Sequence, residues 1–204
     1  MKSDALAFGI AGVLFGLIAG WIIGSQQAAS RPPTAVAPSA AAAAPAGGSS
    51  TRAAVLDEAQ VTALKSVAER EPSSPAPRVQ LANMYFDAEK YDDAITWYGA
   101  ALKLKPNDVD VSTDLGVSYY YTNQPDKALA QFDTSLKLDP KHAKTLLNIG
   151  IVKAFGKQDL KGASEAWQEV LKVAPNSQEA QAAKRALDGL SSAHPAAGGG
   201  KPGA

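Results

Sequence analysis

The 204-residue sequence contains no cysteine and only two histidines. Without cysteine there is no disulfide framework, no thiol redox chemistry and no cysteine-based zinc site. His142 and His194 both lack the helical i, i+4 partner and the carboxylate spacing of a metal-binding motif. Stability must therefore come from side-chain packing, and we expect neither a metal nor another cofactor.

Patterns typical of enzymes are also missing from the sequence. It has no Gly-rich phosphate loop, nucleophile elbow or Walker pattern, so we predict that the chain is not an enzyme. Acidic pairs such as Asp92 and Asp93 lie where helices are expected to begin, and carboxylates there favour the positive end of the helix dipole. Lysine plus arginine and aspartate plus glutamate both number 20, and this balance argues against a nucleic-acid partner.

Charge is absent from residues 5–24, a run of 20 apolar and small residues. At about 1.5 Å rise per residue, such a helix can cross a hydrocarbon core of roughly 30 Å. We therefore expect a transmembrane helix at 5–24 that inserts in the lipid bilayer. The alternative is a cleaved signal peptide, whose apolar region is shorter, about 7–15 residues. Because Lys2 precedes the run and the next basic residue is Arg31, the positive-inside bias predicts an inner-membrane protein with its N-terminus in the cytoplasm and the remaining chain outside it, in the periplasm.

Glycine recurs at every fourth position of this predicted span, at Gly12, Gly16, Gly20 and Gly24. Small residues at this spacing leave one helix face open to the close approach of another helix. The glycines therefore predict a packing face within the membrane. The alternative is that they reflect only the general abundance of glycine in membrane helices.

Two segments lack the apolar content of a folded core. Residues 25–51 are dominated by Ala, Pro, Ser and Gly, and residues 191–204 have a similar composition. Such segments cannot bury enough apolar surface to offset the entropy of ordering. We predict a disordered linker at 25–51 and a disordered tail at 191–204.

Between these segments the sequence repeats itself. Pro72, Pro106, Pro140 and Pro175 are separated by 34, 34 and 35 residues. Aligned on the prolines, the first copy has Leu81, Ala82, Tyr85, Ala94, Tyr98 and Ala101. The second has Leu115, Gly116, Tyr119, Ala128, Phe132 and Ser135. The third has Ile149, Gly150 and Lys153, then, after one inserted residue, Ala163, Trp167 and Val170.

This pattern resembles the tetratricopeptide repeat (TPR) family, in which large, small and aromatic residues recur at these offsets before a closing proline. The small residues lie where two antiparallel helices cross closely, so each repeat is expected to be a helical hairpin. We predict an all-α, right-handed superhelix at 53–190, with three repeats at about 75–108, 109–142 and 143–176. The expected A helices are 75–88, 109–122 and 143–156, the expected B helices are 91–104, 125–138 and 159–174, and half-repeat helices at 53–70 and 177–190 complete the stack.

The resemblance implies a protein or peptide ligand bound in the concave groove that the A helices line. The groove positions of the family fall here on Val79, Asn83, Phe86, Asp87, Thr113, Val117, Tyr120, Tyr121, Lys144, Leu147, Ile151 and Phe155. Tyr119, Tyr120 and Tyr121 cannot all face one core, so we assign Tyr119 to packing and the other two to the groove. Packing of Tyr120 and Tyr121 against neighbouring helices is the alternative.

Some TPR domains hold a peptide carboxylate with lysine, asparagine and arginine at set positions. Asn83, Lys144 and Asn148 match positions of that type, but Val79 and Asp114 depart from it, so we expect the groove to take an apolar or aromatic segment instead. The resemblance thus favours a membrane-anchored interaction scaffold. The alternative is a self-associating assembly subunit, a homo-oligomer, because the layout resembles bacterial membrane-tethered TPR proteins, including the repeat subunits of cytochrome c maturation.

Overall fold

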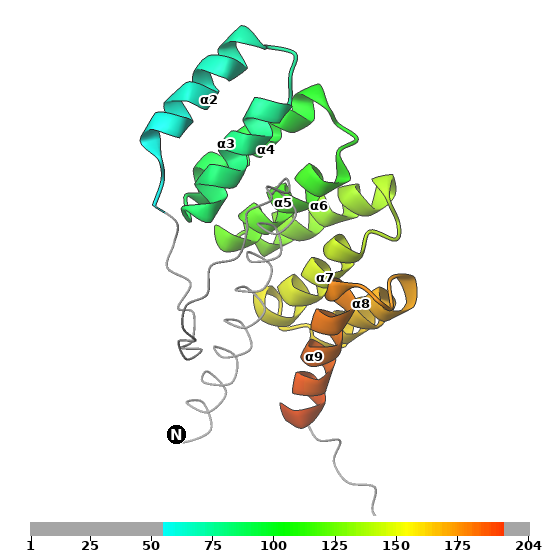
Figure 1. Ribbon diagram of the computed structural model, residues 1–204. Coiled ribbons are helices and arrows are strands. Elements are labelled where there is room, and N and C mark those ends of the chain that lie inside the picture. The colour runs from blue at the N-terminus through cyan, green and yellow to red at the C-terminus, as the bar shows by residue number, and fades with distance from the viewer. Residues whose placement is uncertain (1–54, 194–204) are drawn as a thin grey trace, which may run out of the picture. The chain divides into compact units, whose positions relative to one another are not determined.

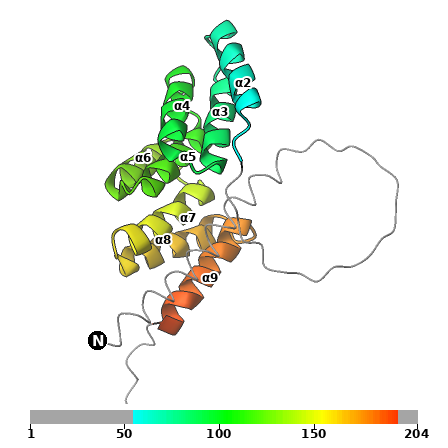
Figure 2. The ribbon, with the colours of Figure 1, turned by 90° about the vertical axis from the view of Figure 1, so that its left-hand side faces the viewer.

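The computed structural model describes residues 55–193, which form eight α-helices and no strand. Successive helices pack as antiparallel hairpins that follow one another from α2 to α9 (Figures 1 and 2). The helices are α2 (Glu58–Arg70), α3 (Ala76–Asp87), α4 (Tyr91–Leu104), α5 (Val109–Tyr121), α6 (Pro125–Leu138), α7 (Ala143–Ile151), α8 (Leu160–Val173) and α9 (Gln178–Ala193), with a π-helical turn η1 (Val152–Gly156) continuing α7.

The three hairpins are α3–α4, α5–α6 and α7–α8, as the repeat alignment predicts. Their cores contain the aligned large and small residues, and Leu81, Phe132 and Trp167 are at most 1% exposed. At the crossings, a methyl group added at Gly116 would lie 2.5 Å from Phe132 Cε1, and one at Gly150 would collide with the indole of Trp167. Only glycine therefore leaves room for these rings. Tyr119 and Lys153, at the third alignment position, are only half-buried.

Helix starts follow local chemistry. The Asp57 carboxylate accepts hydrogen bonds from the amides of Ala59 and Gln60, so α2 begins at Glu58 rather than at the predicted residue 53. The Asp108 side chain caps α5 in the same way, because it accepts a hydrogen bond from Val111 N at 3.2 Å. Pro125 occupies the first turn of α6, where its missing N–H leaves no helical hydrogen bond unmade.

The turn inside each hairpin contains a residue with positive φ: Glu89, Asn123 and Gln158, at 57°, 58° and 57°. In the first two turns the chain closes each A helix with a Schellman motif. Lys90 N donates to Tyr85 O at 2.8 Å, and Gln124 N donates to Tyr119 O at 2.9 Å. None of the three residues is glycine, so each turn carries the strain of a left-handed L-residue.

The third turn differs because the repeat contains one additional residue. The turn η1 absorbs this insertion through wider hydrogen bonds, Lys157 N to Val152 O at 3.0 Å and Asp159 N to Lys153 O at 2.8 Å. The predicted A helix at 143–156 is therefore α-helical only to Ile151 and π-helical from Val152.

The structure tests only part of the predicted chain organisation. The predicted span 5–24, with Gly12, Gly16, Gly20 and Gly24, and the linker 25–51 lie outside the described residues. Among residues 55–193 no helix combines the length and apolar character needed to cross a membrane. The boundary predicted at residue 191 is wrong, because α9 continues to Ala193. There the hydroxyls of Ser191 and Ser192 donate to Asp188 O and cover a carbonyl of the last turn.

Candidate interaction face

The predicted groove residues lie on α3, α5, α7 and η1, and we call the side of the stack formed by these helices the A-helix face. It is continuous, because side chains of α3 contact α5 and side chains of α5 contact α7. The predicted residues differ in exposure. Buried are Phe86, Thr113, Val117, Leu147 and Ile151; half-buried are Val79, Asp87, Tyr120, Tyr121, Lys144 and Phe155; exposed is Asn83.

Tyr121 belongs to an aromatic cluster that joins the first repeat to the second. Its ring stacks on Tyr91 with centroids 4.6 Å apart and an interplanar angle of 10°. Phe86 meets both rings edge to face, at 5.3 Å from Tyr91 and 5.7 Å from Tyr121. Such pairs stabilise beyond the area that they bury, so Tyr121 holds two repeats together. Burial raises the pKa of Tyr91 to about 12 and raises the pKa of Tyr121 further.

Tyr120 lies on the other side of the same helix end. Its ring centroid is 5.9 Å from that of Tyr121, and its Cε2 would lie 3.2 Å from a methyl group added at Gly156 in η1. The two tyrosines therefore approach opposite neighbours, Tyr121 the first repeat and Tyr120 the third. The structure supports the alternative considered above, since both rings pack against adjacent repeats while staying half-buried.

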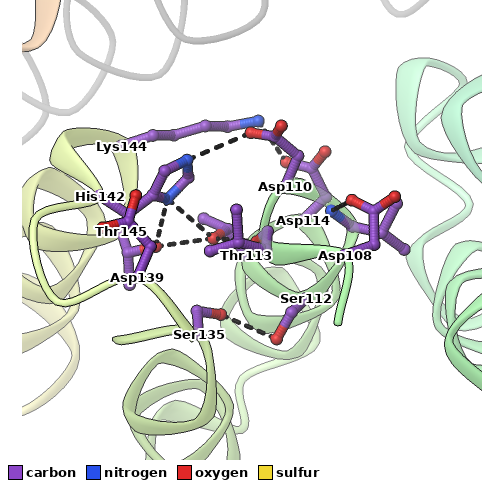
Figure 3. Close-up of polar contacts among 12 residues, drawn as sticks. Asp108, Asp110, Ser112, Thr113, Asp114, Ser135, Asp139, His142, Lys144 and Thr145 are labelled. Atoms are coloured by element: carbon purple, nitrogen blue, oxygen red, sulfur yellow. Dashed lines mark hydrogen bonds and ion pairs between the residues drawn. The ribbon is translucent and has the colours of Figure 1, made fainter. Parts of the chain in front are cut away.

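A polar network connects the second and third repeats across this face (Figure 3). Asp110 Oδ1 on α5 lies 3.2 Å from Nε2 of His142, the residue that precedes α7. His142 Nδ1 lies 2.7 Å from Thr145 Oγ1, and Thr145 Oγ1 lies 2.7 Å from Thr113 Oγ1. These contacts explain why Thr113 and Thr145 are fully buried although they are polar.

The direction of these hydrogen bonds depends on the charge of the imidazole. With neutral His142, Thr113 donates to Thr145, Thr145 donates to Nδ1, and Nε2–H donates to Asp110. With both ring nitrogens protonated, His142 donates to Thr145, Thr145 donates to Thr113, and Thr113 donates to Val109 O at 2.8 Å. Every donor has an acceptor in both arrangements, so the buried hydroxyls of Thr113 and Thr145 are satisfied in each.

An ion pair lies beside this network. Lys144 Nζ on α7 is 2.7 Å from Asp114 Oδ1 on α5, and the two side chains are 22% and 15% exposed. Burial raises the pKa of Asp114, while Lys144 acts against that rise. The hydrogen bond with His142 lowers the pKa of Asp110. The only lysine among the predicted groove residues is thus already held by a carboxylate of the neighbouring helix.

Asp87 is different from the other carboxylates of this face. Within residues 55–193 its side chain makes no hydrogen bond or ion pair, although it is half-buried. Burial raises the pKa of Asp87, and repulsion by Asp114 adds to the rise. Nearby, Asn83 Oδ1 accepts a hydrogen bond of 2.7 Å from the Tyr98 hydroxyl, which leaves the amide NH₂ of Asn83 on the exposed side.

Sequence reasoning missed two contributors to this face. The repeat pattern assigns Tyr91 only to the start of a B helix, yet its ring contacts both Phe86 and Tyr121 in the aromatic cluster. His142 was placed in a loop without a partner, and its contact with Asp110 spans two repeats. The 34-residue offset could have indicated that polar groups of α5 and α7 meet here, because it puts Asp110 and Lys144 at equivalent positions of these two adjacent helices. In the part of the chain that the structure describes, no group of three or more His, Asp or Glu residues is arranged to hold a metal ion.

Comparison with known proteins agrees with this geometry. A family profile described as a TPR repeat matches residues 82–123, and one described as a tetratricopeptide repeat matches residues 110–142. The chain therefore contains tetratricopeptide repeats. Neither profile describes a catalytic family. No curated protein sequence matches this TPR protein.

Solved structures share the TPR fold. The crystal structure of MamA has 19% sequence identity and a TM-score of 0.55, and the match covers 64% of this chain and 76% of MamA. The NMR structure of the first TPR domain of human RPAP3 has 22% identity and a TM-score of 0.52, over 61% of this chain and 98% of that domain. The first TPR of Spaghetti (RPAP3), bound to the HSP90 peptide SRMEEVD, has 23% identity and a TM-score of 0.50, over 69% and 98%. At these identities the likeness concerns the fold alone.

Proposed function

We propose that this TPR protein is a membrane-anchored scaffold that binds a protein partner through its A-helix face. The observation that carries the proposal is the pair of half-buried side chains at equivalent positions of the first two repeats, Asp87 and Tyr121, beside half-buried Tyr120 and Lys144. Large aromatic side chains at such places bury much area with little loss of rotamer freedom when a partner docks. A TPR of the same fold with a bound peptide, the Spaghetti domain, supports a protein or peptide ligand.

The anchoring part of the proposal depends on residues 5–24. A single span there would hold the repeats near the outer face of the inner membrane and raise their effective concentration for a partner at that surface. Alkaline extraction of membranes tests this. We expect the full chain to stay in the pellet and the fragment 53–190 to appear in the soluble fraction. A full chain that is extracted as readily as the fragment would contradict the anchor.

Site-specific photo-crosslinking in intact cells tests the binding face. Benzoylphenylalanine replaces Asn83, which is exposed on α3, and in a matched control it replaces Thr134, which is exposed on α6. We expect the same partner to crosslink at position 83 but not at position 134. Crosslinks at 134 alone would place function on the B helices. If position 83 captures only other copies of this chain, the self-associating assembly subunit replaces the scaffold as the better explanation.

A further inference from the structure

Asp87, on the A-helix face, is a half-buried carboxylate without a charge partner among residues 55–193. A half-buried carboxylate is normally compensated by a hydrogen-bond donor or a cation, because partial burial removes water that would otherwise solvate it. Asp110 has His142 and Asp114 has Lys144, but Asp87 has no such partner among residues 55–193. The neighbouring carboxylate of Asp114 makes its environment more negative still.

The charges around Asp87 also favour a basic ligand over an acidic one. Around Asp87 three carboxylates, those of Asp87, Asp110 and Asp114, lie beside the ammonium group of Lys144 and the imidazole of His142. Lys144 is held by Asp114 at 2.7 Å, so an acidic ligand would have to displace that ion pair before reaching the lysine. A cationic ligand can pair with Asp87 without displacing the Lys144–Asp114 ion pair, and complementary charge favours both its association and its register on the face.

We propose that the segment bound by the A-helix face carries a lysine or arginine whose charged head lies between Asp87 on α3 and Asp114 on α5. This inference rests on the proposed function and specifies its partner. The stem of the basic side chain packs on the aromatic rings at the ends of α3 and α5, as long basic side chains do on apolar surfaces. The exposed amide NH₂ of Asn83 donates to a backbone carbonyl of the bound segment. The same carboxylates disfavour an acidic segment by like-charge repulsion.

The test uses the full-length chain in neutral detergent and an array of random nonapeptides. Basic and acidic residues are equally frequent in the array as a whole, so that some peptides carry only one kind of charge. Peptides with lysine or arginine should be enriched among those bound. The strongest binder is then synthesised in three forms, with its basic residue kept or replaced by norleucine or glutamate. Norleucine keeps the aliphatic stem and removes the charge, so it isolates the ionic contribution.

The decisive variant is Asp87→Asn, with Asp133→Asn on the exposed side of α6 as the matched control. Asp87→Asn should weaken the basic peptide about tenfold and the norleucine peptide less than twofold, because only the former loses a charge partner. Asp133→Asn should leave both affinities unchanged. Asp114→Asn should release Lys144 and shift the preference of the array toward acidic peptides. Circular dichroism verifies that each variant is helical and melts cooperatively.

Each other outcome has a separate meaning. An array that binds no peptide would overturn both the proposed function and the basic-residue preference. Binding without a basic preference, or a loss in Asp87→Asn that is equal for the basic and norleucine peptides, would overturn only the preference and leave the scaffold function standing. A wild-type preference for acidic peptides would also overturn the preference, and would favour a carboxylate ligand for Lys144.

Discussion

Replacing Gly150 by alanine should destabilise the repeat domain, whereas the same change at Gly99 should stabilise it. Both glycines lie inside helices, Gly150 in α7 and Gly99 in α4, so each alanine improves helix propensity by about 1 kcal/mol. The difference lies in what the new methyl group meets. At Gly99 no atom lies within 4 Å of the added Cβ, while at Gly150 the indole of Trp167 occupies that space, with its Cε2 at 2.6 Å.

Any movement of the Trp167 ring would disturb the packing around it and its hydrogen bond. It is 1% exposed, and its Nε1–H donates to Leu147 O at 3.1 Å. Overpacking in a core costs about 1–3 kcal/mol, and a buried donor left without an acceptor costs about 1–3 kcal/mol more. After the gain in helix propensity, we expect Gly150→Ala to lower the free energy of unfolding by about 2 kcal/mol. Gly99→Ala should raise it by about 0.5–1 kcal/mol.

The assay is urea and thermal unfolding of the fragment 53–190 followed by circular dichroism at the helix band. The expected shifts in Tm are roughly 5–10 °C downward for Gly150→Ala and about 2–4 °C upward for Gly99→Ala. Gly116→Ala should fall between Gly150→Ala and the wild type, because it displaces the ring of Phe132 but breaks no hydrogen bond of that ring. If Gly150→Ala is as stable as Gly99→Ala, Trp167 does not cross over α7 as described.

Three further predictions concern charge, turns and aromatic packing. The folded pKa of Asp87 is raised, so its ionised form costs stability at neutral pH. Because water screens this half-exposed carboxylate, Asp87→Asn should raise the free energy of unfolding at pH 7 by less than about 0.5 kcal/mol. Urea titrations should show this gain vanishing as the pH falls below about 3.9. Glu89 has positive φ, so Glu89→Gly should raise the free energy of unfolding by about 0.5–1 kcal/mol in thermal melts. Asn123→Gly should raise it by less, because asparagine tolerates that conformation better than glutamate does. Tyr121→Ala should lower the free energy of unfolding by about 2–3 kcal/mol and Tyr121→Phe by less than about 1 kcal/mol, because phenylalanine keeps the stacking on Tyr91; equal losses in urea unfolding would contradict the packing role.

The helices and the core could be predicted from the sequence because the same pattern of large and small residues recurs in three successive repeats. Leu81 and Leu115, or Ala94 and Ala128, are weak signals singly but occupy equivalent buried places in successive hairpins. Each hairpin contacts only its neighbours, so local patterns determine most of the fold. Starts such as Asp57 were harder to place, because a single capping carboxylate decides where the helix begins.

The interaction face was less predictable, because the contacts that define it join different repeats. The family offsets place Thr113 and Leu147 on the A-helix face, but they do not reveal that Thr145 buries the hydroxyl of Thr113. They also treat Lys144 as a lone cation, although Asp114 on the neighbouring helix holds it. Pairings of this kind depend on distances between helices, and no offset within one repeat encodes them.

The inserted residue of the third repeat changes the helix geometry at η1, so the 34-residue offset does not predict the orientation of Phe155 there. Phe155 was assigned to the groove because it follows Tyr121 by 34 residues, which assumes the same helical rotation at both positions. In η1 the chain advances with i→i+5 hydrogen bonds, so each residue turns through a smaller angle than in an α-helix and the face that Phe155 occupies departs from that of Tyr121. Asn83, by contrast, lies in a regular stretch of α3 before any irregularity, and its exposure follows from the α-helical register alone. The partner contacts are therefore better mapped from Asn83 than from Phe155, because the repeat offset and the backbone geometry agree at Asn83 and disagree at Phe155.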